Sequence, residues 1–257
     1  MKTFCFTIDD NIRFLKEIAR GGAVSLFDHP YTALLKKLHG ETGVKIQLNL
    51  FMRCEDFSLC EMPGKFKPEW EDCADWLRLS FHSDRENVSP YASAGYGEVF
   101  SDCGAVIDEI KRFAGERSAA QTTTVHYCDT TPEGARALAD RGYKGLLGLF
   151  GAGSEKRTSY GLDEYTADKI RGGSTVKIDG VTYAAIDCIM NLCGKDEMIR
   201  RIKELEPREH ISVMIHEQYF YCDYPYYQPD FGEKLSAAFA LFAAERRKSV
   251  FFEDIAE

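Results

Sequence analysis

The stretch TFCFTIDDN, residues 3–11, ends a mostly apolar run with two adjacent carboxylates, Asp9 and Asp10. Residues 3–8 have the pattern of a β-strand. Two neighbouring carboxylates are unfavourable unless a cation or a shared proton compensates for their charges. Capping of a helix N-terminus would explain one aspartate and would leave the second unexplained. The rest of the chain must show whether the pair caps a helix or takes part in catalysis or metal binding.

The composition is that of an ordinary globular protein. The 257 residues suffice for one large α/β domain or two small ones, with 44% hydrophobic and 28% charged residues. The net charge of −9 argues against a general nucleic-acid-binding protein, which needs a basic face. No apolar run is long enough to cross a membrane. The sequence gives no indication of the oligomeric state.

The N-terminal region and the cysteines bear on the location of the protein. Residues 1–6 enter a strand-like pattern directly, without a secretory apolar segment and a small-residue cleavage site. The nine cysteines are widely scattered and show no CxxC spacing, so no disulfide framework is indicated. Together these observations predict a cytoplasmic protein.

Strand-like runs alternate with helix-like runs along the chain. The strand-like runs are residues 3–8, 44–51, 76–81, 122–128, 143–150, 211–215 and 250–252. The helix-like runs are residues 11–20, 29–40, 97–114, a segment capped by Thr131, 196–205 and 231–247. This alternation predicts a parallel sheet with helical crossovers. No Gly-rich phosphate loop follows the first strand, so we favour a (β/α) barrel, complete or incomplete, over a Rossmann fold.

Residues 151–190 interrupt this alternation. They contain Asp179-Gly180 between two alternating runs, which predicts a β-hairpin with a type I′ turn. We therefore expect a single barrel domain over residues 1–257, with a β-hairpin insertion at about 151–190.

Polar side chains follow four of the predicted strands at the point where each strand ends. These residues are Asp9, Asp10, His82, Glu86, His126, Tyr127, His216, Glu217 and Tyr219. In a parallel barrel the carboxyl ends of the strands converge on one rim, where active sites are built. We therefore expect these side chains to share one pocket.

A mixed set of histidines and carboxylates favours a divalent transition metal over calcium, which prefers oxygen ligands alone. Such a metal would lower the pKa of a bound water. It would also offset the charge of one aspartate, while the other acts as a base towards that water. Plainer alternatives are a capping role for the Asp9-Asp10 pair, a solvated Glu86, a polar strand end at His126 and core packing for the aromatic run at 219–231.

Three motifs resemble those of the polysaccharide deacetylases, the NodB-homology carbohydrate esterases. TIDD at 7–10 resembles their T-F-D-D motif, HSDRE at 82–86 their H-S/T-x-x-H motif, and MIH at 214–216 their late L-x-H motif. The order along the chain also agrees. The resemblance implies a distorted, incomplete, seven-stranded (β/α) TIM-like barrel that removes acetyl groups from N-acetylated sugars with a divalent metal.

The resemblance also implies roles for single residues. Asp9 would be the general base and His216 the general acid. Asp10 and His82 would bind the metal, zinc or another transition metal such as Ni, Co or Mn. Glu86 stands where the family has a second motif histidine, so it would be the third ligand.

The family's R-x-P motif is absent, and His126-Tyr127-Cys128 stands in its place. We expect His126 and Tyr127 to contact substrate, together with Glu217 and Tyr219.

The expected function is that of a metal-dependent hydrolase, which removes an acyl group from an N-acylated sugar or a small sugar-like molecule. The expected partner is thus a small molecule or an oligosaccharide, and neither nucleic acid nor a membrane. One alternative is a metal-free glycosidase that uses two carboxylates, for instance Asp9 and Glu217. Another is a carbohydrate-binding barrel without catalysis, because a fold does not determine a function.

Overall fold

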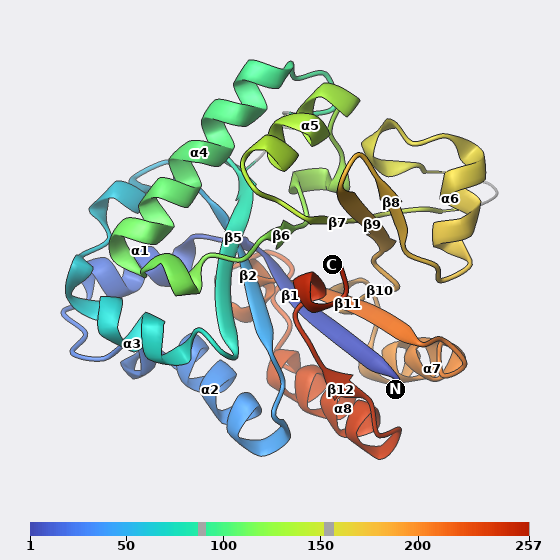
Figure 1. Ribbon diagram of the computed structural model, residues 1–257. Coiled ribbons are helices and arrows are strands. Elements are labelled where there is room, and N and C mark those ends of the chain that lie inside the picture. Colours follow the sequence, from blue (N-terminus) through green and yellow to red (C-terminus); the bar gives the residue numbers. More distant parts are fainter. Residues whose placement is uncertain (87–90, 152–156, 257) are drawn as a thin grey trace.

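The computed structural model describes residues 1–86, 91–151 and 157–256 (Figure 1). Strands and helices alternate along the chain, as predicted. The helices are α1 (Arg13–Arg20), α2 (Pro30–Thr42), α3 (Lys67–Cys73), α4 (Tyr96–Phe113), α5 (Pro132–Asp140), α6 (Glu164–Arg171), α7 (Lys195–Glu204) and α8 (Phe231–Ala244). None of the helices in these described ranges combines the length and the apolar character needed to span a membrane.

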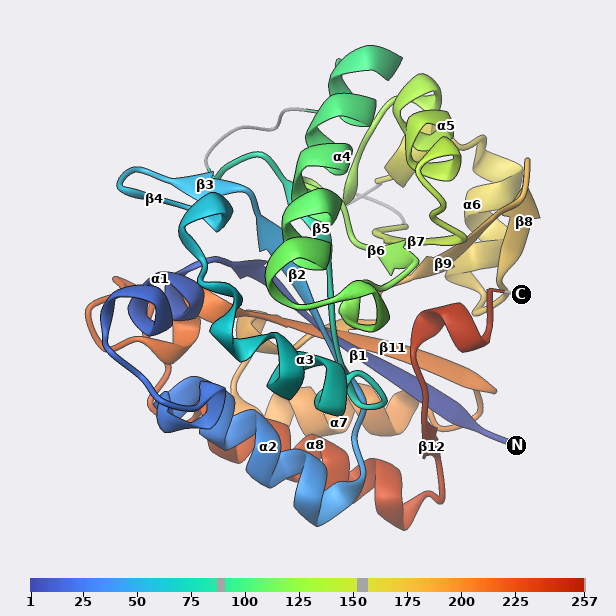
Figure 2. The ribbon, with the colours of Figure 1, turned by 60° about the vertical axis from the view of Figure 1, so that its left-hand side comes forward.

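The larger sheet has the order β10-β11-β1-β2-β5, with β12 paired to β1, and all its pairs are parallel. Its strands are β1 (Thr3–Asn11), β2 (Ile46–Phe51), β5 (Leu77–Ser83), β10 (Cys188–Ile189), β11 (His210–His216) and β12 (Lys248–Ser249). Figure 2 shows α4 and α5 on one side of these strands and α2, α7 and α8 on the other.

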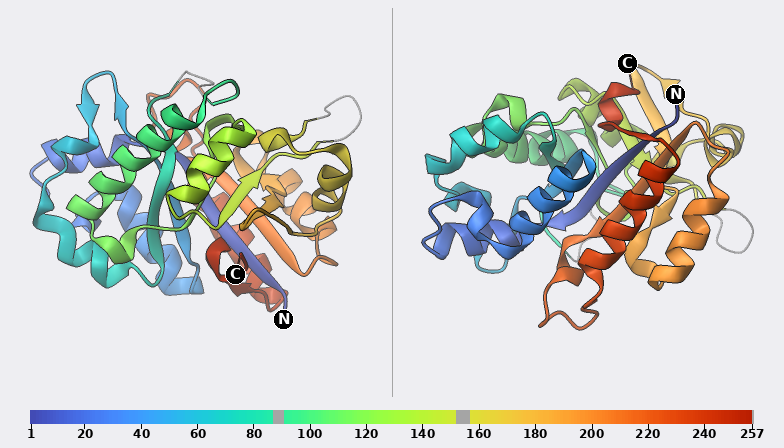
Figure 3. Two further views of the ribbon diagram at one scale, coloured as in Figure 1. Left: turned by 45° about the horizontal axis from the view of Figure 1, so that its top comes forward. Right: turned by 90° about the horizontal axis from the view of Figure 1, so that it is seen from below.

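A second sheet has the order β6-β7-β9-β8, and its β8–β9 pair is antiparallel. Its strands are β6 (Thr122–Thr123), β7 (Gly145–Gly148), β8 (Val176–Ile178) and β9 (Val181–Ala185). A short hairpin, β3 (Arg53–Cys54) and β4 (Phe57–Ser58), stands apart from both sheets (Figure 3).

Backbone hydrogen bonds link the second sheet to the first on both sides. Ala120 N donates to Leu79 O of β5 at 2.8 Å, and Asp187 N donates to Ser212 O of β11 at 2.8 Å. The predicted α/β fold with a mostly parallel sheet is thus confirmed, and the arrangement is consistent with a barrel. Closure of the barrel and the count of seven strands stay predictions.

The predicted hairpin at Asp179-Gly180 is confirmed. Both residues have positive φ, 49° and 85°, as a type I′ turn requires. The second strand of the hairpin, β9, also pairs in parallel with β7, so the hairpin is part of the second sheet. The insertion over 151–190 stays a prediction, and residues 152–156 of it lie outside the described residues.

Several predicted element boundaries were wrong. The strand predicted over 122–128 ends at Thr123, and the positive φ of 58° at Tyr127 and 54° at Cys128 excludes a regular strand that runs to residue 128. The last strand is Lys248–Ser249 and not 250–252. Helix α2 passes through Gly40 and ends at Thr42, and the φ of 70° at the following Gly43 suits a helix C-terminus. Helix α3 was not predicted.

Strand β1 separates two packing environments. Phe4 and Phe6 pack against α8, where Phe4 lies 4.3 Å from Phe242 between ring centroids and Phe6 lies 5.0 Å from Phe239. The intervening Cys5 belongs to a separate apolar cluster with Leu147, Ala184, Met214 and other residues of the strands. Because side chains alternate along a strand, Asp9 lies on the same face of β1 as Cys5.

His210 at the start of β11 gives the protein a predictable response to acid. Its ring nitrogens hydrogen-bond with Thr3 Oγ1 at 3.1 Å and Ser212 Oγ at 3.0 Å. Burial, reinforced by the charge of Arg247, lowers the pKa of His210 to about 4. Protonation below pH 6.5 therefore favours the unfolded chain, so this part of the stability is present above pH 6.5 and is lost as the pH falls towards 4.

We predict that His210→Gln reduces the acid sensitivity of the protein. Between pH 7 and pH 4 the free energy of unfolding should fall by about 3 kcal/mol less in the variant than in the wild type. Urea unfolding at both pH values measures this difference, and the comparison at pH 7 corrects for the substitution itself. An equal fall in both proteins contradicts the prediction.

Candidate metal centre

A β-bulge explains why two adjacent aspartates face one pocket. The register of β1 on β2 shifts by one residue between Ile8 and Asn11, and Asp10 has a φ of 61°. In a regular strand Asp9 and Asp10 would point to opposite faces, whereas a bulge re-aims one side chain. Both carboxylates accordingly line the same cavity. A positive φ at a non-glycine residue costs about 1–2 kcal/mol, which the contacts of Asp10 must offset.

Asp10 lies at the centre of a buried cluster with His82 and His126. Its Oδ1 lies 3.0 Å from His82 Nε2 and 3.2 Å from His126 Nδ1, and the two nitrogens lie 3.1 Å apart. One oxygen and two imidazole nitrogens thus converge on a small volume. This donor set suits a divalent transition metal, so the residues present fit such an ion.

Further hydrogen bonds orient the cluster. His82 Nδ1 lies 2.5 Å from Thr124 O, and a carbonyl only accepts, so Nδ1 carries a proton and Nε2 is the ring nitrogen that faces Asp10. Gln218 Nε2 donates to Asp10 Oδ2 at 2.7 Å, which leaves Oδ1 for the histidines. His126 Nε2 is buried and has no hydrogen-bond partner among the described residues.

The pKa values of the aspartate pair are pushed apart. Burial raises the pKa of Asp9 to about 6, although the charge of His82 and the 2.6 Å hydrogen bond from Asn49 Nδ2 act against the shift. Burial also acts to raise the pKa of Asp10, but hydrogen bonds with His126 and His82 outweigh it and lower that pKa well below its usual value. Asp10 is thus held as an anion, and Asp9 can exchange a proton near neutral pH.

His216 lies beside Asp9, because the two residues are register partners on β11 and β1. Its Nδ1 lies 2.9 Å from Asn191 Oδ1, and its ring contacts the ring of Tyr219. Burial lowers the pKa of His216, although the charge of Asp10 acts in the opposite direction. The predicted base and the predicted acid therefore line one cavity.

Glu217 caps helix α1 across about two hundred residues of sequence. Its buried carboxylate accepts backbone N–H bonds from Ile12 at 2.8 Å, Arg13 at 3.1 Å and Phe14 at 2.7 Å, and the hydroxyl of Tyr221 donates to it at 2.8 Å. Burial raises the pKa of Glu217 to about 7, against the effect of these donors. The capping carboxylate of this helix is therefore Glu217 and not the Asp9-Asp10 pair.

The cavity at the cluster has a volume of about 330 Å³. Its lining combines the aspartates and the histidines with Arg157 and with the less polar side chains of Cys128, Leu149, Ile189 and Met214. Tyr127 lines the rim and is 48% exposed, with its ring against His126. An adjoining charged groove of about 750 Å³ shares Asp10, Glu86, Gln218 and Tyr224 with the cavity.

No family model and no curated protein match the sequence. Several solved structures are similar to this structure. The 4-α-glucanotransferase from Thermococcus litoralis aligns with 99% of this chain over 40% of its own, at 13% identity and a TM-score of 0.59. A CE4 family pseudoenzyme from Bacillus anthracis aligns with 100% of this chain over 66% of its own, at 9% identity and a TM-score of 0.54. A family 4 acetyl xylan esterase from Clostridium thermocellum, in complex with a cobalt ion, aligns with 99% of this chain over 90% of its own, at 11% identity and a TM-score of 0.55.

The chain has the fold of the CE4 carbohydrate esterases. The resemblance to polysaccharide deacetylases in the motifs is thus confirmed at the level of the fold. The chain spans less than half of the glucanotransferase and 66% of the pseudoenzyme. At these identities the likeness concerns the fold alone.

Within this CE4-like fold the third position of the cluster is filled differently from the expectation. The structure brings together Asp10, His82 and His126, and Glu86 is not a member of the cluster. Residues 84–86 after β5 form bends and a turn, so Glu86 four residues after His82 does not share a helical face with it. Glu86 lines the cavity, where burial and the charge of Asp10 raise its pKa. A ligand role for Glu86 stays a prediction.

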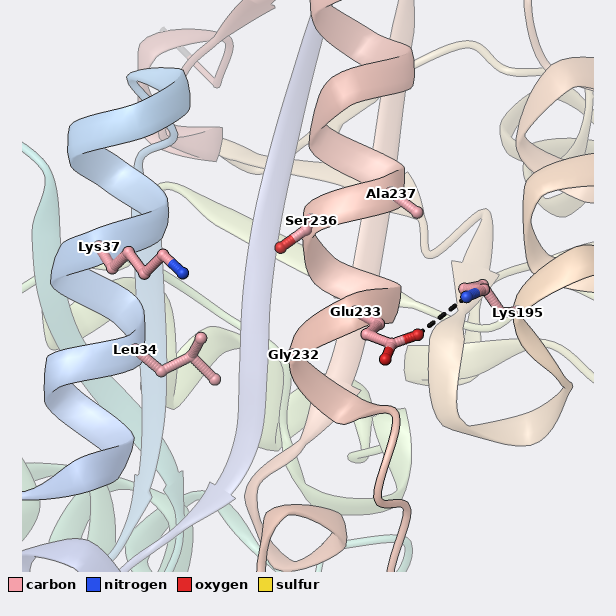
Figure 4. Close-up of a pocket in the computed structure, with 7 residues that line it drawn as sticks. All are labelled: Leu34, Lys37, Lys195, Gly232, Glu233, Ser236 and Ala237. Carbon is pink, nitrogen blue, oxygen red and sulfur yellow. Dashed lines mark hydrogen bonds and ion pairs between the residues drawn. The ribbon is translucent and has the colours of Figure 1, made fainter.

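An open groove between α2 and α8, with α7 at its side, offers no comparable chemistry (Figure 4). Its only carboxylate, Glu233, pairs with Lys195 at 2.9 Å. None of the residues predicted for the site lines this groove.

We predict that Glu217→Ala destabilises the protein by about 2–4 kcal/mol, because three N–H groups at the start of α1 lose their acceptor. Urea unfolding at pH 7 measures the loss. Glu233→Ala is the matched control, since Glu233 also lies in the first turn of a helix but its side chain is 70% exposed. The control should change stability by less than about 1 kcal/mol. Equal effects of the two variants contradict a buried capping role.

Proposed function

We propose that this protein is a metal-dependent hydrolase that removes an acyl group from an N-acylated sugar or a small sugar-like substrate. One observation carries the proposal: Asp10, His82 and His126 converge in the cavity that Asp9 and His216 also line, in a protein with the CE4 esterase fold. Acetyl is the simplest acyl group that could lie against the apolar side chains of the lining.

Asp10, His82 and His126 would hold the metal, zinc or another transition metal such as Ni, Co or Mn. When bound, the metal would acidify a water and polarise the substrate carbonyl. Asp9 takes a proton from the attacking water, for which a pKa of about 6 is well placed. His216 gives a proton to the amine nitrogen as the carbon–nitrogen bond breaks. A new carbon–oxygen bond forms on the acyl group, so the products are a carboxylic acid and an amine.

Substrate contacts belong to the same proposal. Tyr127 and Tyr219 lie next to His126 and His216 respectively, where their rings could stack on a sugar. Contact of Glu217 with substrate has less support, because four donors already occupy the roughly four acceptor sites of its carboxylate. The same saturation argues against a glycosidase that would use Glu217.

A binding protein without catalysis is a second candidate, favoured by the similarity of fold to a CE4 family pseudoenzyme. Such a binding protein would have the same candidate metal cluster as the proposed hydrolase but would not convert its substrate. Activity measurements therefore separate the two.

We predict that metal binding depends on His126 more than on Glu86. Titration calorimetry with Zn²⁺ and Co²⁺ on metal-stripped protein should show at least 100-fold weaker binding for His126→Gln and less than about 5-fold for Glu86→Gln. Equal losses, or a larger loss for Glu86→Gln, contradict this assignment of ligands.

Acetate release from N-acetylated chito-oligosaccharides tests the reaction itself. Turnover should stop with a chelator, return with added metal, and fall by about 10²–10⁴-fold in Asp9→Asn, which should still bind metal. Turnover that survives chelation contradicts the proposal. Metal and saccharide binding without acetate release supports the second candidate.

A further inference from the structure

Among the described residues that line the cavity, Arg157 brings the one permanent positive charge. The same lining holds the carboxyl groups of Asp9, Asp10 and Glu86, but the guanidinium does not pair with them. Within the described ranges, the polar partner of the Arg157 side chain is the backbone carbonyl of Tyr127, to which Nη2 donates. A guanidinium stays charged at any physiological pH, and a carbonyl does not neutralise it. The cavity therefore contains a cation without a counter-anion.

The backbone next to Arg157 is held in place by β7 and the residues that follow it. Ser159 N donates to Leu149 O at 3.2 Å, and Ser159 Oγ accepts from Leu149 N at 2.9 Å. Tyr160 is 1% exposed, and its hydroxyl donates to Leu147 O at 2.5 Å. The chain that carries Arg157 is thus anchored two residues further on, so the guanidinium is presented to the cavity from a fixed position.

The guanidinium acts on the same groups as the candidate base. Burial raises the pKa of the Cys128 thiol, and the charge of Asp9 adds to this shift, whereas the charge of Arg157 opposes it. All three side chains line one cavity of about 330 Å³. A monosaccharide placed at Asp9 can therefore contact Arg157 with another of its substituents.

The chemistry of arginine selects the kind of substituent. The planar guanidinium offers several N–H donors in a fork that matches the two oxygens of a carboxylate or a phosphate, and such charge-assisted pairs are stronger than bonds to a neutral hydroxyl. The protein as a whole has a net charge of −9 and does not attract anions in general. A preference for an anion must therefore come from a local group such as Arg157.

We propose that Arg157 is a specificity-determining residue that binds a carboxylate or phosphate group on the N-acylated sugar, so that the preferred substrate is an anionic sugar. The inference rests on the proposed function for the reaction, but the preference in binding can be measured without turnover. Arg157 comes from the segment after β7, whereas Asp9 and His216 lie on β1 and β11. Selection of the substrate is thus assigned to a different part of the chain from proton transfer.

Titration calorimetry on Zn²⁺-loaded Asp9→Asn protein tests the preference. The probes are N-acetylglucosamine, its 1-phosphate, its 6-phosphate and N-acetylglucosaminuronic acid, which carries a carboxylate at carbon 6. At least one anionic sugar should bind about 10–100-fold more tightly than the neutral sugar. The comparison of phosphate with carboxylate at carbon 6 identifies the anion. Equal affinities for all four sugars would overturn the proposal.

Substitutions in the same background locate the source of the preference. Arg157→Gln should remove it, and Arg157→Lys should keep only part of it, because an ammonium retains the charge but lacks the planar fork. Arg85→Gln is the matched control, since Arg85 lines the adjoining groove but already pairs with Asp84 at 3.0 Å. It should retain the preference. Persistence of the preference in Arg157→Gln, as expected if the anion binds the metal instead, would overturn the assignment, and so would an equal loss in the two Gln variants.

Kinetics of acetate release connect the preference to the reaction. Arg157→Gln should raise KM for the preferred anionic sugar about 10–100-fold with little change in kcat, because the contact is made before and during the reaction alike. A loss confined to kcat would contradict this role. If an anionic sugar binds through Arg157 but is not hydrolysed by the wild type, the proposed function fails and the assignment of Arg157 stands. If the wild type hydrolyses N-acetylglucosamine and prefers none of the anionic sugars, the assignment fails and the function stands.

Discussion

The bulge at the end of β1 is the constraint on which the candidate site depends. It turns two neighbouring carboxylates into one cavity, and two negative charges at this distance are unfavourable unless the surroundings move the two pKa values apart. The surroundings of Asp9 and of Asp10 shift these pKa values by different means. Asp10 receives hydrogen bonds from two histidines and Gln218, whereas Asp9 is buried with a single amide donor. Of these two adjacent residues, Asp10 is thus an anion and Asp9 is a group that can exchange a proton.

The end of β11 performs two separate tasks through adjacent residues. His216 points to the cavity beside Asp9, while Glu217 turns to the N-terminus of α1 and satisfies three of its backbone N–H groups. Helix α1 follows directly after β1, so the cap also fixes the segment that leaves the bulge. The catalytic candidates and the local stability of the fold are therefore coupled through one short stretch of chain.

The third member of the cluster comes from a different segment of the chain than the motif spacing predicts. Motif spacing directs attention to Glu86, which lines the same cavity but is not a member of the cluster with Asp10 and His82. His126 joins the cluster from the segment after β6, where the next two residues, Tyr127 and Cys128, have positive φ. The resulting set of one carboxylate and two imidazoles has one negative charge fewer than the set expected from the motif.

The sequence by itself determined the alternation of strands and helices, the type I′ hairpin and the strand ends that carry the site residues, because these follow from local patterns and turn chemistry. It also selected the aspartate pair and three histidines as one group. Only the tertiary structure decided that His126 joins Asp10 and His82, that Glu217 caps α1, and that Arg157 lines the cavity. Those contacts join segments tens to hundreds of residues apart, and local periodicity contains no information on which side chains meet across a barrel.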